Sequence, residues 1–422
     1  MATVIIFIGL LIFFAHLCNA IFSKQRIPDV LLLLGIGILI GPVLNIVKPD
    51  DFGALGSIFS SLTLLFILFD NGVDMSIDSL RRYWKGFVQV TFLSFIISMT
   101  VVALIGRQMG FEWRDAWLMG SMLAGTAAAI VIPLVKQMKV SEYTATVLCM
   151  EGALSAVLCI VVSLSVIDGY EVDSMGVAAI LGKVIATIFM SLLLGVVGGI
   201  LWSGVLVRVR KLQNSMFLTP AFVFIVYGVA EALGYNGPIS ALAIGIVLGN
   251  IEYFEFSFVR RMHKRGMASL APNEKSFYKE LVFVLKTFFF VYIGICIPFT
   301  NGVALLYGLV ITMALFVVRF ALIAVVGRNN LPDDRLTVSM MIPKGLASAA
   351  LAALPEQVNA SVGYELIPGA TMIKYVVYSV IFFSIIVTSI LVLITRRRLM
   401  IPDVDPGKVL HGELEGNDPL SQ

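Results

Sequence analysis

A few ionisable side chains lie inside long apolar runs of this sequence, and they are its first candidates for chemistry. They are Asp70 (which Asn71 follows), Glu151, Lys286, Arg319 and Lys344. A charge inside a bilayer is costly, so such residues mark ion pathways or pair with one another. Because a buried charge needs a partner, we predict that Glu151 and Lys344 form an ion pair between two core helices.

The composition places these runs in a membrane. The chain has 422 residues, of which 59% are hydrophobic and 14% charged, and its mean hydropathy is +0.96. A soluble domain is about 45–50% apolar and about a quarter charged. A net charge of +3 offers no basic face for nucleic acid. No phosphate loop, metal-ligand spacing or catalytic Ser/His set is present, so we expect neither an enzyme nor a bound cofactor.

Thirteen apolar runs are long enough to be bilayer-spanning helices, which need about 20 residues. They cover residues 3–21, 29–47, 53–73, 87–106, 115–135, 143–166, 175–206, 215–233, 236–253, 280–298, 302–326, 336–355 and 370–395. Most Lys and Arg lie in loops after odd-numbered runs, whereas loops after even-numbered runs hold only Lys48, Arg107 and Arg114. Cytoplasmic loops retain positive charge. We therefore predict an all-α polytopic protein with the N-terminus outside and the C-terminus inside.

Two pairs of segments indicate an internal repeat. Leu34–Gly41 resembles Leu242–Gly249, and Phe69–Gly72 corresponds more loosely to Val291–Gly294. Both pairs are seven runs apart, and an odd displacement reverses the orientation across the membrane. Inverted repeats of this kind are typical of secondary transporters.

The repeat divides the chain into two six-helix units. Repeat one covers 1–166, the run 175–206 is a linker, and repeat two covers 215–396, within a transmembrane domain of 1–398. The polar tail 399–422 is expected to be disordered and cytoplasmic. In the linker, the Gly195-x-x-x-Gly199 spacing allows close contact with another helix.

The same repeat predicts which helices are broken. Gly125–Pro133 in the fifth run and Pro343–Ala349 in the twelfth both place Gly and Pro among small or hydroxyl residues. An unwound segment there exposes carbonyl oxygens that can replace the hydration shell of an ion. We expect the two broken helices to cross near the midplane of the membrane.

The ordered motifs resemble the monovalent cation:proton antiporter superfamily, of the sodium/proton exchanger type. Arg26–Pro42 looks like the second span of that family, and Leu68–Asp74 resembles its Phe-Glu-Gly-Gly segment. Pro343–Ala350 lies where the family has an Arg-Gly stretch in its second broken helix.

The resemblance implies a homodimer in the plasma membrane of a prokaryote. Each protomer would have a dimerisation domain and a six-helix core that moves in an elevator-like exchange of sodium, potassium or lithium for protons. A partly buried carboxylate couples the two because it binds either a proton or a cation. The resemblance places this site near Thr126, Ala127, Glu151, Ser155 and Ala156.

The sequence departs from the family where that carboxylate belongs. Glu151 matches the family's helix-linking glutamate, and Ser155 replaces an asparagine. Ala156 stands where the family has its ion-binding aspartate, and Thr126-Ala127 lacks the family's acid as well. The hydroxyls of Thr126 and Ser155, the carbonyls near Ala127 and any acid at 156 would be the ligands of a monovalent cation.

Several explanations of this departure stay open. The chain is a disabled variant, an exchanger that couples through Glu151 or another acid, or an uncoupled relative that acts as a uniporter, channel or sensor. An organic-anion carrier on the same scaffold would instead use the cations Lys286, Arg319 and Lys344.

Overall fold

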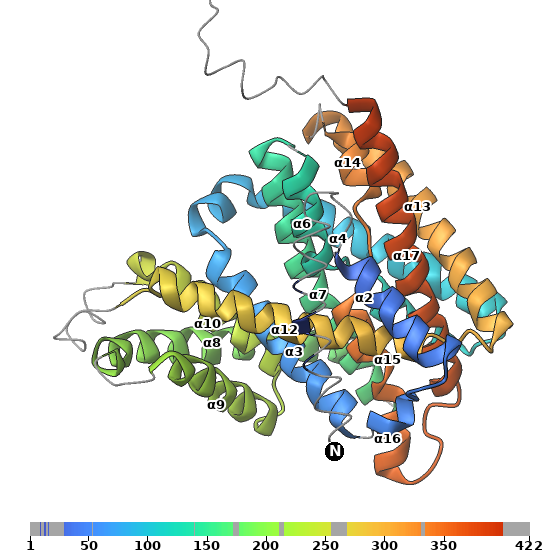
Figure 1. Ribbon diagram of the computed structural model, residues 1–422, viewed down its shortest axis with the longest axis horizontal. Helices are drawn as coiled ribbons and strands as arrows, with labels where there is room; N and C mark the ends of the chain where they lie inside the picture. The colour runs from blue at the N-terminus through green and yellow to red at the C-terminus, as the bar shows by residue number, and fades with distance from the viewer. Residues whose placement is uncertain are drawn as a thin grey trace, which may run out of the picture.

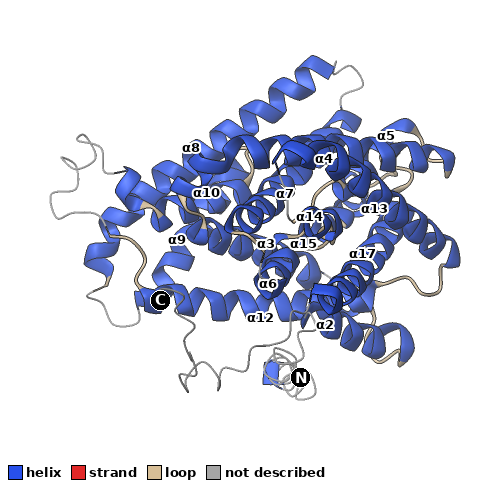
Figure 2. Cartoon of the chain, turned by 90° about the horizontal axis from the view of Figure 1, so that it is seen from above, coloured by secondary structure: helices blue, strands red, loops and turns tan. Residues whose placement is uncertain are grey.

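The described part of the chain is helical throughout. The computed structural model describes residues 29–52, 54–138, 140–171, 177–210, 215–254, 268–330 and 334–399, together with Gly9, Ile12, Phe13 and His16. Figure 2 shows only helices and loops in these residues. The all-α class is therefore confirmed. The first predicted run, 3–21, lies outside the described residues except at those four positions, and so does the tail beyond Leu399.

Every other predicted run coincides with a described helix or a pair of helices. They are α2 (Asp29–Ile38) with η1 (Leu39–Val43), α3 (Ala54–Asp74), α4 (Ile77–Gln108), α5 (Trp113–Leu123) with α6 (Ala128–Met138), α7 (Glu142–Glu171), α8 (Val177–Val209), α9 (Leu218–Ala232), α10 (Gly237–Gly249), α12 (Pro272–Cys296), α13 (Gly302–Asn330), α14 (Arg335–Met340) with α15 (Leu346–Ala352), and α17 (Ala370–Leu399). The short helix α16 (Leu354–Val362) precedes α17. By length and hydropathy alone, five of the described helices can cross a bilayer.

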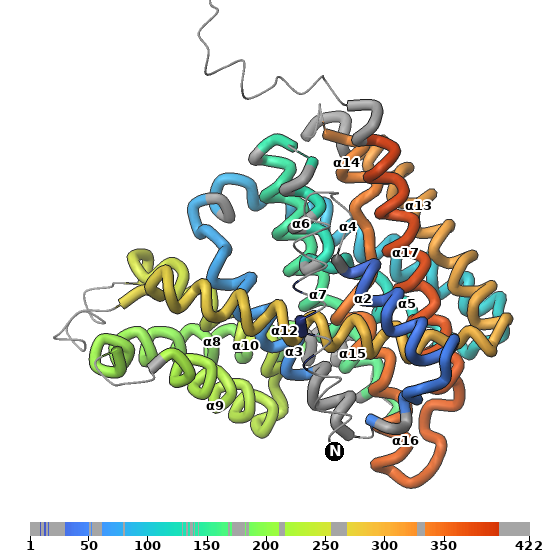
Figure 3. The backbone as a smooth tube through the Cα atoms, in the orientation of Figure 1, coloured from blue at the N-terminus to red at the C-terminus, as the bar shows by residue number. Residues whose placement is uncertain are grey.

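The helices pack in two groups (Figures 1 and 3). In one group, α10 lies against α3, α8 and α9, while α12 packs along α2 and α3. In the other group, α4, α5, α6 and α7 pack together. Helices α13 and α17 pack against each other and against α14, and α17 also contacts α15. Helix α15 contacts α3, so the second broken helix lies where the two groups meet.

Glycines allow two helix pairs of the first group to approach at backbone distance. On α2, a β-carbon at Gly37 would collide with the Val291 carbonyl oxygen of α12, and one at Gly294 would collide with the Leu34 carbonyl oxygen. Only glycine fits where two helix backbones touch in this way. These residues belong to the segments that indicated the repeat.

The α3–α10 pair has the same contacts. A β-carbon at Gly245 would collide with the Phe69 carbonyl oxygen, and one at Gly72 would collide with the Leu242 carbonyl oxygen. When the repeat segments are aligned, each of these four residues stands at the same position as one of the contacting residues of the α2–α12 pair. The α2–α12 and α3–α10 pairs, each formed by helices far apart in the sequence, are therefore packed through corresponding residues.

The glycines of α8 contact a helix of the same chain. Gly195 lies against Ser240, and Gly199 lies against Val247, both on α10. The close contact expected from their spacing is thus made inside the protomer, and the outward face of α8 presents other side chains, among them Ile185 and Phe189.

Substituting these glycines tests the backbone contacts. Gly37→Ala should lower the melting temperature in detergent, because overpacking costs about 1–3 kcal/mol. Gly35→Ala, two residues away on the same helix, is the matched control because a β-carbon there meets no atom within 4 Å. Alanine in a helix is more favourable than glycine by up to about 1 kcal/mol of folding free energy. The melting temperature of the control should therefore be unchanged or higher. Equal melting temperatures for the two variants would contradict the close approach of α2 and α12.

Candidate functional site

The first helix break lies between α5 and α6, and α7 provides partners for its backbone. Residues 124–127 are not helical. The Thr126 amide donates a hydrogen bond to Ser155 Oγ at 3.0 Å, and the Gly125 amide donates to Cys159 Sγ at 3.0 Å. Unpaired backbone groups are costly in a membrane, so these side chains from α7 make the break tolerable.

The second break repeats this arrangement between α14 and α15. Residues 341–345 are not helical. The Lys344 amide donates to Ser384 Oγ of α17 at 2.9 Å. In each break, a serine on the long helix that follows accepts a hydrogen bond from an unwound amide. Both breaks overlap the segments that the sequence predicted, and each begins one or two residues earlier.

The two breaks cross in contact with each other. The Ala127 amide donates to the Pro343 carbonyl oxygen at 2.8 Å, and Lys344 Nζ donates to the Gly125 carbonyl oxygen at 2.8 Å. A β-carbon at Gly345 would lie 2.6 Å from Ala127 Cβ, so glycine is required for this approach. The crossing expected from the sequence is therefore present.

A small cavity of about 30 Å³ lies beside the crossing. Residues of both breaks, of α3 and of α7 line it, including Asn71, Thr126, Ala127, Ala156, Cys159 and Ser348. Thr126 Oγ1 lies 3.2 Å from Ser155 Oγ, so four of the five predicted site residues meet here. No carboxylate is among the residues that line this small cavity.

Glu151, the fifth, pairs with a different cation from the one predicted. Its two carboxylate oxygens accept hydrogen bonds from Arg319 Nη1 at 2.6 Å and Nη2 at 2.7 Å. Both side chains are 2% exposed. Arg319 also donates to Ser94 Oγ and to the Val338 carbonyl oxygen. The predicted pair with Lys344 was therefore wrong.

The reason is geometric. The planar guanidinium matches both oxygens of a carboxylate, which a single ammonium cannot do. Lys344 is instead held by Gly125 in the first break. The sequence marked Arg319 as an intramembrane cation in need of a partner, but residue types alone provide no distance by which to rank Lys286, Arg319 and Lys344.

The remaining candidates lie in different places. Asn71 lines the small cavity, and its Nδ2 atom is buried without a hydrogen-bond partner. Asp70 is half-buried on α3, one residue away. Lys286 is half-buried on α12 and lines neither of the two described cavities. None of the three cations of the organic-anion hypothesis lines either of the two described cavities.

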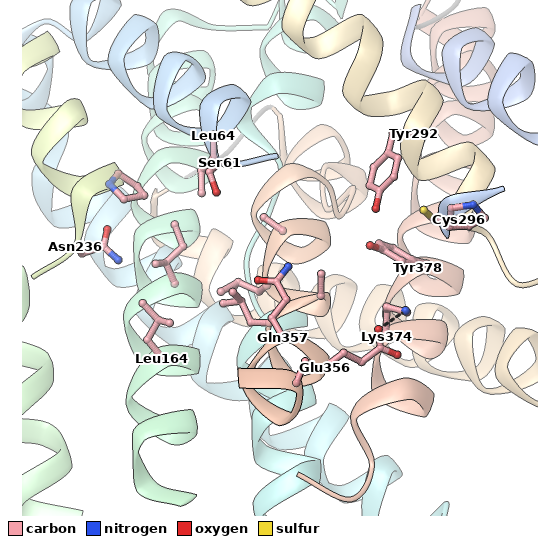
Figure 4. Close-up of a pocket in the computed structure, with 18 of the residues that line it drawn as sticks. Ser61, Leu64, Leu164, Asn236, Tyr292, Cys296, Glu356, Gln357, Lys374 and Tyr378 are labelled. Carbon is pink, nitrogen blue, oxygen red and sulfur yellow. Dashed lines mark hydrogen bonds and ion pairs between the residues drawn. The ribbon is translucent and has the colours of Figure 1, made fainter. Parts of the chain in front are cut away.

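A large cavity of about 940 Å³ separates the two helix groups (Figure 4). Residues of α3, α9, α10 and α12 form one wall, and residues of α7, α15, α16 and α17 form the other. Leu64 lines both the large and the small cavity, so the two adjoin at this residue. Glu356 of α16 and Lys374 of α17 form an ion pair in the wall made by α7, α15, α16 and α17. Sequence reasoning missed Glu356 because it lies just past the end of an apolar run.

Removing one member of the Glu151–Arg319 pair should destabilise the protein strongly. Glu151→Gln leaves a buried guanidinium without its carboxylate, which costs about 3–5 kcal/mol. Glu356→Gln is the comparison, because a partly exposed pair contributes about 0–1 kcal/mol. Thermal unfolding in detergent measures both, together with Arg319→Leu and the double variant Glu151→Gln/Arg319→Leu, which completes a double-mutant cycle. If the double variant lost as much stability as its two single variants combined, the pair would not be coupled.

Comparison with known proteins agrees with the helical membrane fold described above. A family described as sodium/hydrogen exchanger, transmembrane, matches residues 9–396. The Na(+)/H(+) antiporter 1 of Methanocaldococcus jannaschii is 22% identical over 400 residues, which are 87% of this chain and 85% of that protein. The K(+)/H(+) antiporter NhaP2 of a Shewanella species is 26% identical over 244 residues, which are 56% of this chain but 42% of that protein.

Two further proteins extend the comparison. The ammonium/H(+) antiporter subunit AmhT of Alkalihalophilus pseudofirmus is 22% identical over 76% of this chain and 77% of its own length. The solved structure of the sodium proton antiporter MjNhaP1 from Methanocaldococcus jannaschii at pH 8 has the same fold, with a TM-score of 0.73 at 20% identity, over 93% of this chain and 98% of that one. Because the family match covers almost the whole chain, this protein belongs to the sodium/hydrogen exchanger family of multi-pass membrane transporters, and not to a family of enzymes.

Proposed function

We propose that this chain is built to exchange a monovalent cation, sodium first, for protons at the small cavity. The observation that carries the proposal is the crossing of the two breaks against α7, which brings Thr126, Ser155 and Ala156 together. Hydroxyl and carbonyl oxygens are the ligands that hard cations prefer. The names of the relatives include sodium, potassium and ammonium, and sodium is the cation named for the relative that matches most of the chain.

The proposal includes a defect in this chain. Ala156 faces the small cavity, where a carboxylate would let a cation and a proton compete for one site. The pairing of Glu151 with Arg319 argues against Glu151 as a substitute, because both of its oxygens are already engaged. With Ala156 in place, we therefore expect the chain to be a transport-disabled or uncoupled form of an exchanger.

The proposed topology has thirteen spans, with the N-terminus outside and the C-terminus inside, in two inverted repeats of 1–166 and 215–396. The matched glycine contacts of α2–α12 and α3–α10 support this, since an inverted repeat relates one pair to the other. The serines that accept from Thr126 and Lys344 support it too, since they lie on the helix that ends each repeat.

The large cavity would be the outer access route. In the proposed orientation, the start of α3 and the ends of α9 and α12 lie on the outer side, and residues from all three line this cavity. An elevator-like movement of the α4–α7 and α13–α17 group against the other helices would expose the small cavity to each side in turn. We further propose a homodimer in the plasma membrane of a prokaryote, on the basis of the family resemblance and the bacterial and archaeal relatives.

Proton flux in sealed proteoliposomes tests the proposed function. The chain as it stands should show no proton movement when sodium is added, whereas Ala156→Asp should show sodium-dependent proton movement that saturates. Ala156→Asn is the matched control, because it has a similar shape but cannot titrate, and it should stay silent.

Two outcomes would contradict the proposal. Sodium-driven proton flux from the unmodified chain would mean that another acid couples the two ions. Silence from Ala156→Asp, in a sample that reconstitutes with the same melting temperature and yield as the control, would mean that residue 156 is not at the exchange site.

A further inference from the structure

Lys344 carries a buried charge that no carboxylate in the crossing neutralises. Its side chain is 1% exposed, and its Nζ atom donates to the Gly125 carbonyl oxygen. Glu151 is the acid, among the described residues, that interacts with Lys344, and Arg319 binds both of its oxygens. With Lys344 protonated, Glu151, Arg319 and Lys344 together carry one net positive charge. A buried charge without a counter-charge is strongly disfavoured.

The small cavity adjoins this charge and offers hydrogen-bond donors. Gly125 both accepts from Lys344 Nζ and lines the cavity, so one hydrogen bond links the ammonium group to the cavity wall. Asn71 also lines the cavity, and its Nδ2 atom is buried without a hydrogen-bond partner, so this donor needs an acceptor. Ala128, the first residue of α6, also lines the cavity, and a helix N-terminus favours negative charge.

We infer that the small cavity of this chain binds a small inorganic anion, with chloride as the physiological occupant. The anion neutralises Lys344 and accepts from Asn71, in the place that a carboxylate at position 156 would otherwise fill. The inference rests on the proposal that this cavity is the ion site of the transporter. The cavity volume of about 30 Å³ favours a monatomic anion over a larger organic one, since a water molecule alone needs about 10–15 Å³.

The charge at position 156 decides between anion and cation in this account. Ala156→Asp places a carboxylate in the same cavity, where it neutralises Lys344 itself and repels chloride. Ala156→Asn adds no charge, so chloride should still bind. The same substitution that is expected to create cation exchange should therefore abolish anion binding.

Thermal unfolding of the purified full chain in detergent tests the inference. Choline chloride and sodium chloride should both raise the melting temperature relative to sodium gluconate, in proportion to the logarithm of the chloride concentration once the site is saturated. The rise should persist in Ala156→Asn and vanish in Ala156→Asp. Asn71→Leu, which removes the donor and leaves every charge in place, should need a higher chloride concentration to reach the same rise in melting temperature.

The outcomes separate this inference from the proposed function. Equal melting temperatures in chloride and gluconate would overturn it, and would mean that Lys344 is neutral or that the cavity holds water. An equal chloride effect in Ala156→Asp would also overturn it, because chloride would then bind elsewhere. If chloride stabilises the chain while Ala156→Asp fails to exchange ions in proteoliposomes, the anion site stands and the proposed exchange fails.

Discussion

The crossing of two interrupted helices is the constraint on which the rest of this structure depends. An interruption inside a membrane leaves amide and carbonyl groups that water cannot reach, and each one must find a partner in the protein. Here the partners come from the other break, through Ala127 and Pro343, and from serines on α7 and α17. Because every partner lies on a different helix, the two breaks, α7 and α17 must be packed as one unit. The small cavity is the space that this unit leaves against α3.

The buried charges follow from the same packing. Arg319 spans from α13 to α7, where the bidentate contact with Glu151 satisfies both side chains without a contribution from either break. Lys344 has no such partner, and its ammonium group points into the first break, where it binds a carbonyl oxygen. In an exchanger, an acid at position 156 would complete this electrostatic arrangement. With Ala156 no such acid is present, and our two proposals, a loss of cation exchange and an anion site, both rest on this difference.

The sequence predicted the features that depend on local composition. Apolar runs located the helices, and Gly and Pro located both breaks, because unwinding has a local signature in residue type. The matching Gly37 and Gly245 segments indicated which helices are related. The sequence favoured Lys344 over Arg319 as the partner of Glu151, because residue types alone do not show which cation the fold brings within hydrogen-bonding distance of that carboxylate. The meeting of the two cavities at Leu64 could not be predicted either, because both helix groups contribute to their walls and no single sequence motif does.

The central claim is that the charge at position 156 decides which ion occupies the cavity at the crossing. Anomalous diffraction from crystals grown in sodium bromide tests this most directly, because bromide is a heavy substitute for chloride that can be located without ambiguity. We expect a bromide peak between Asn71 and Gly125 in the unmodified chain and no peak there in Ala156→Asp. A peak at this place in both proteins, or in neither, would contradict it.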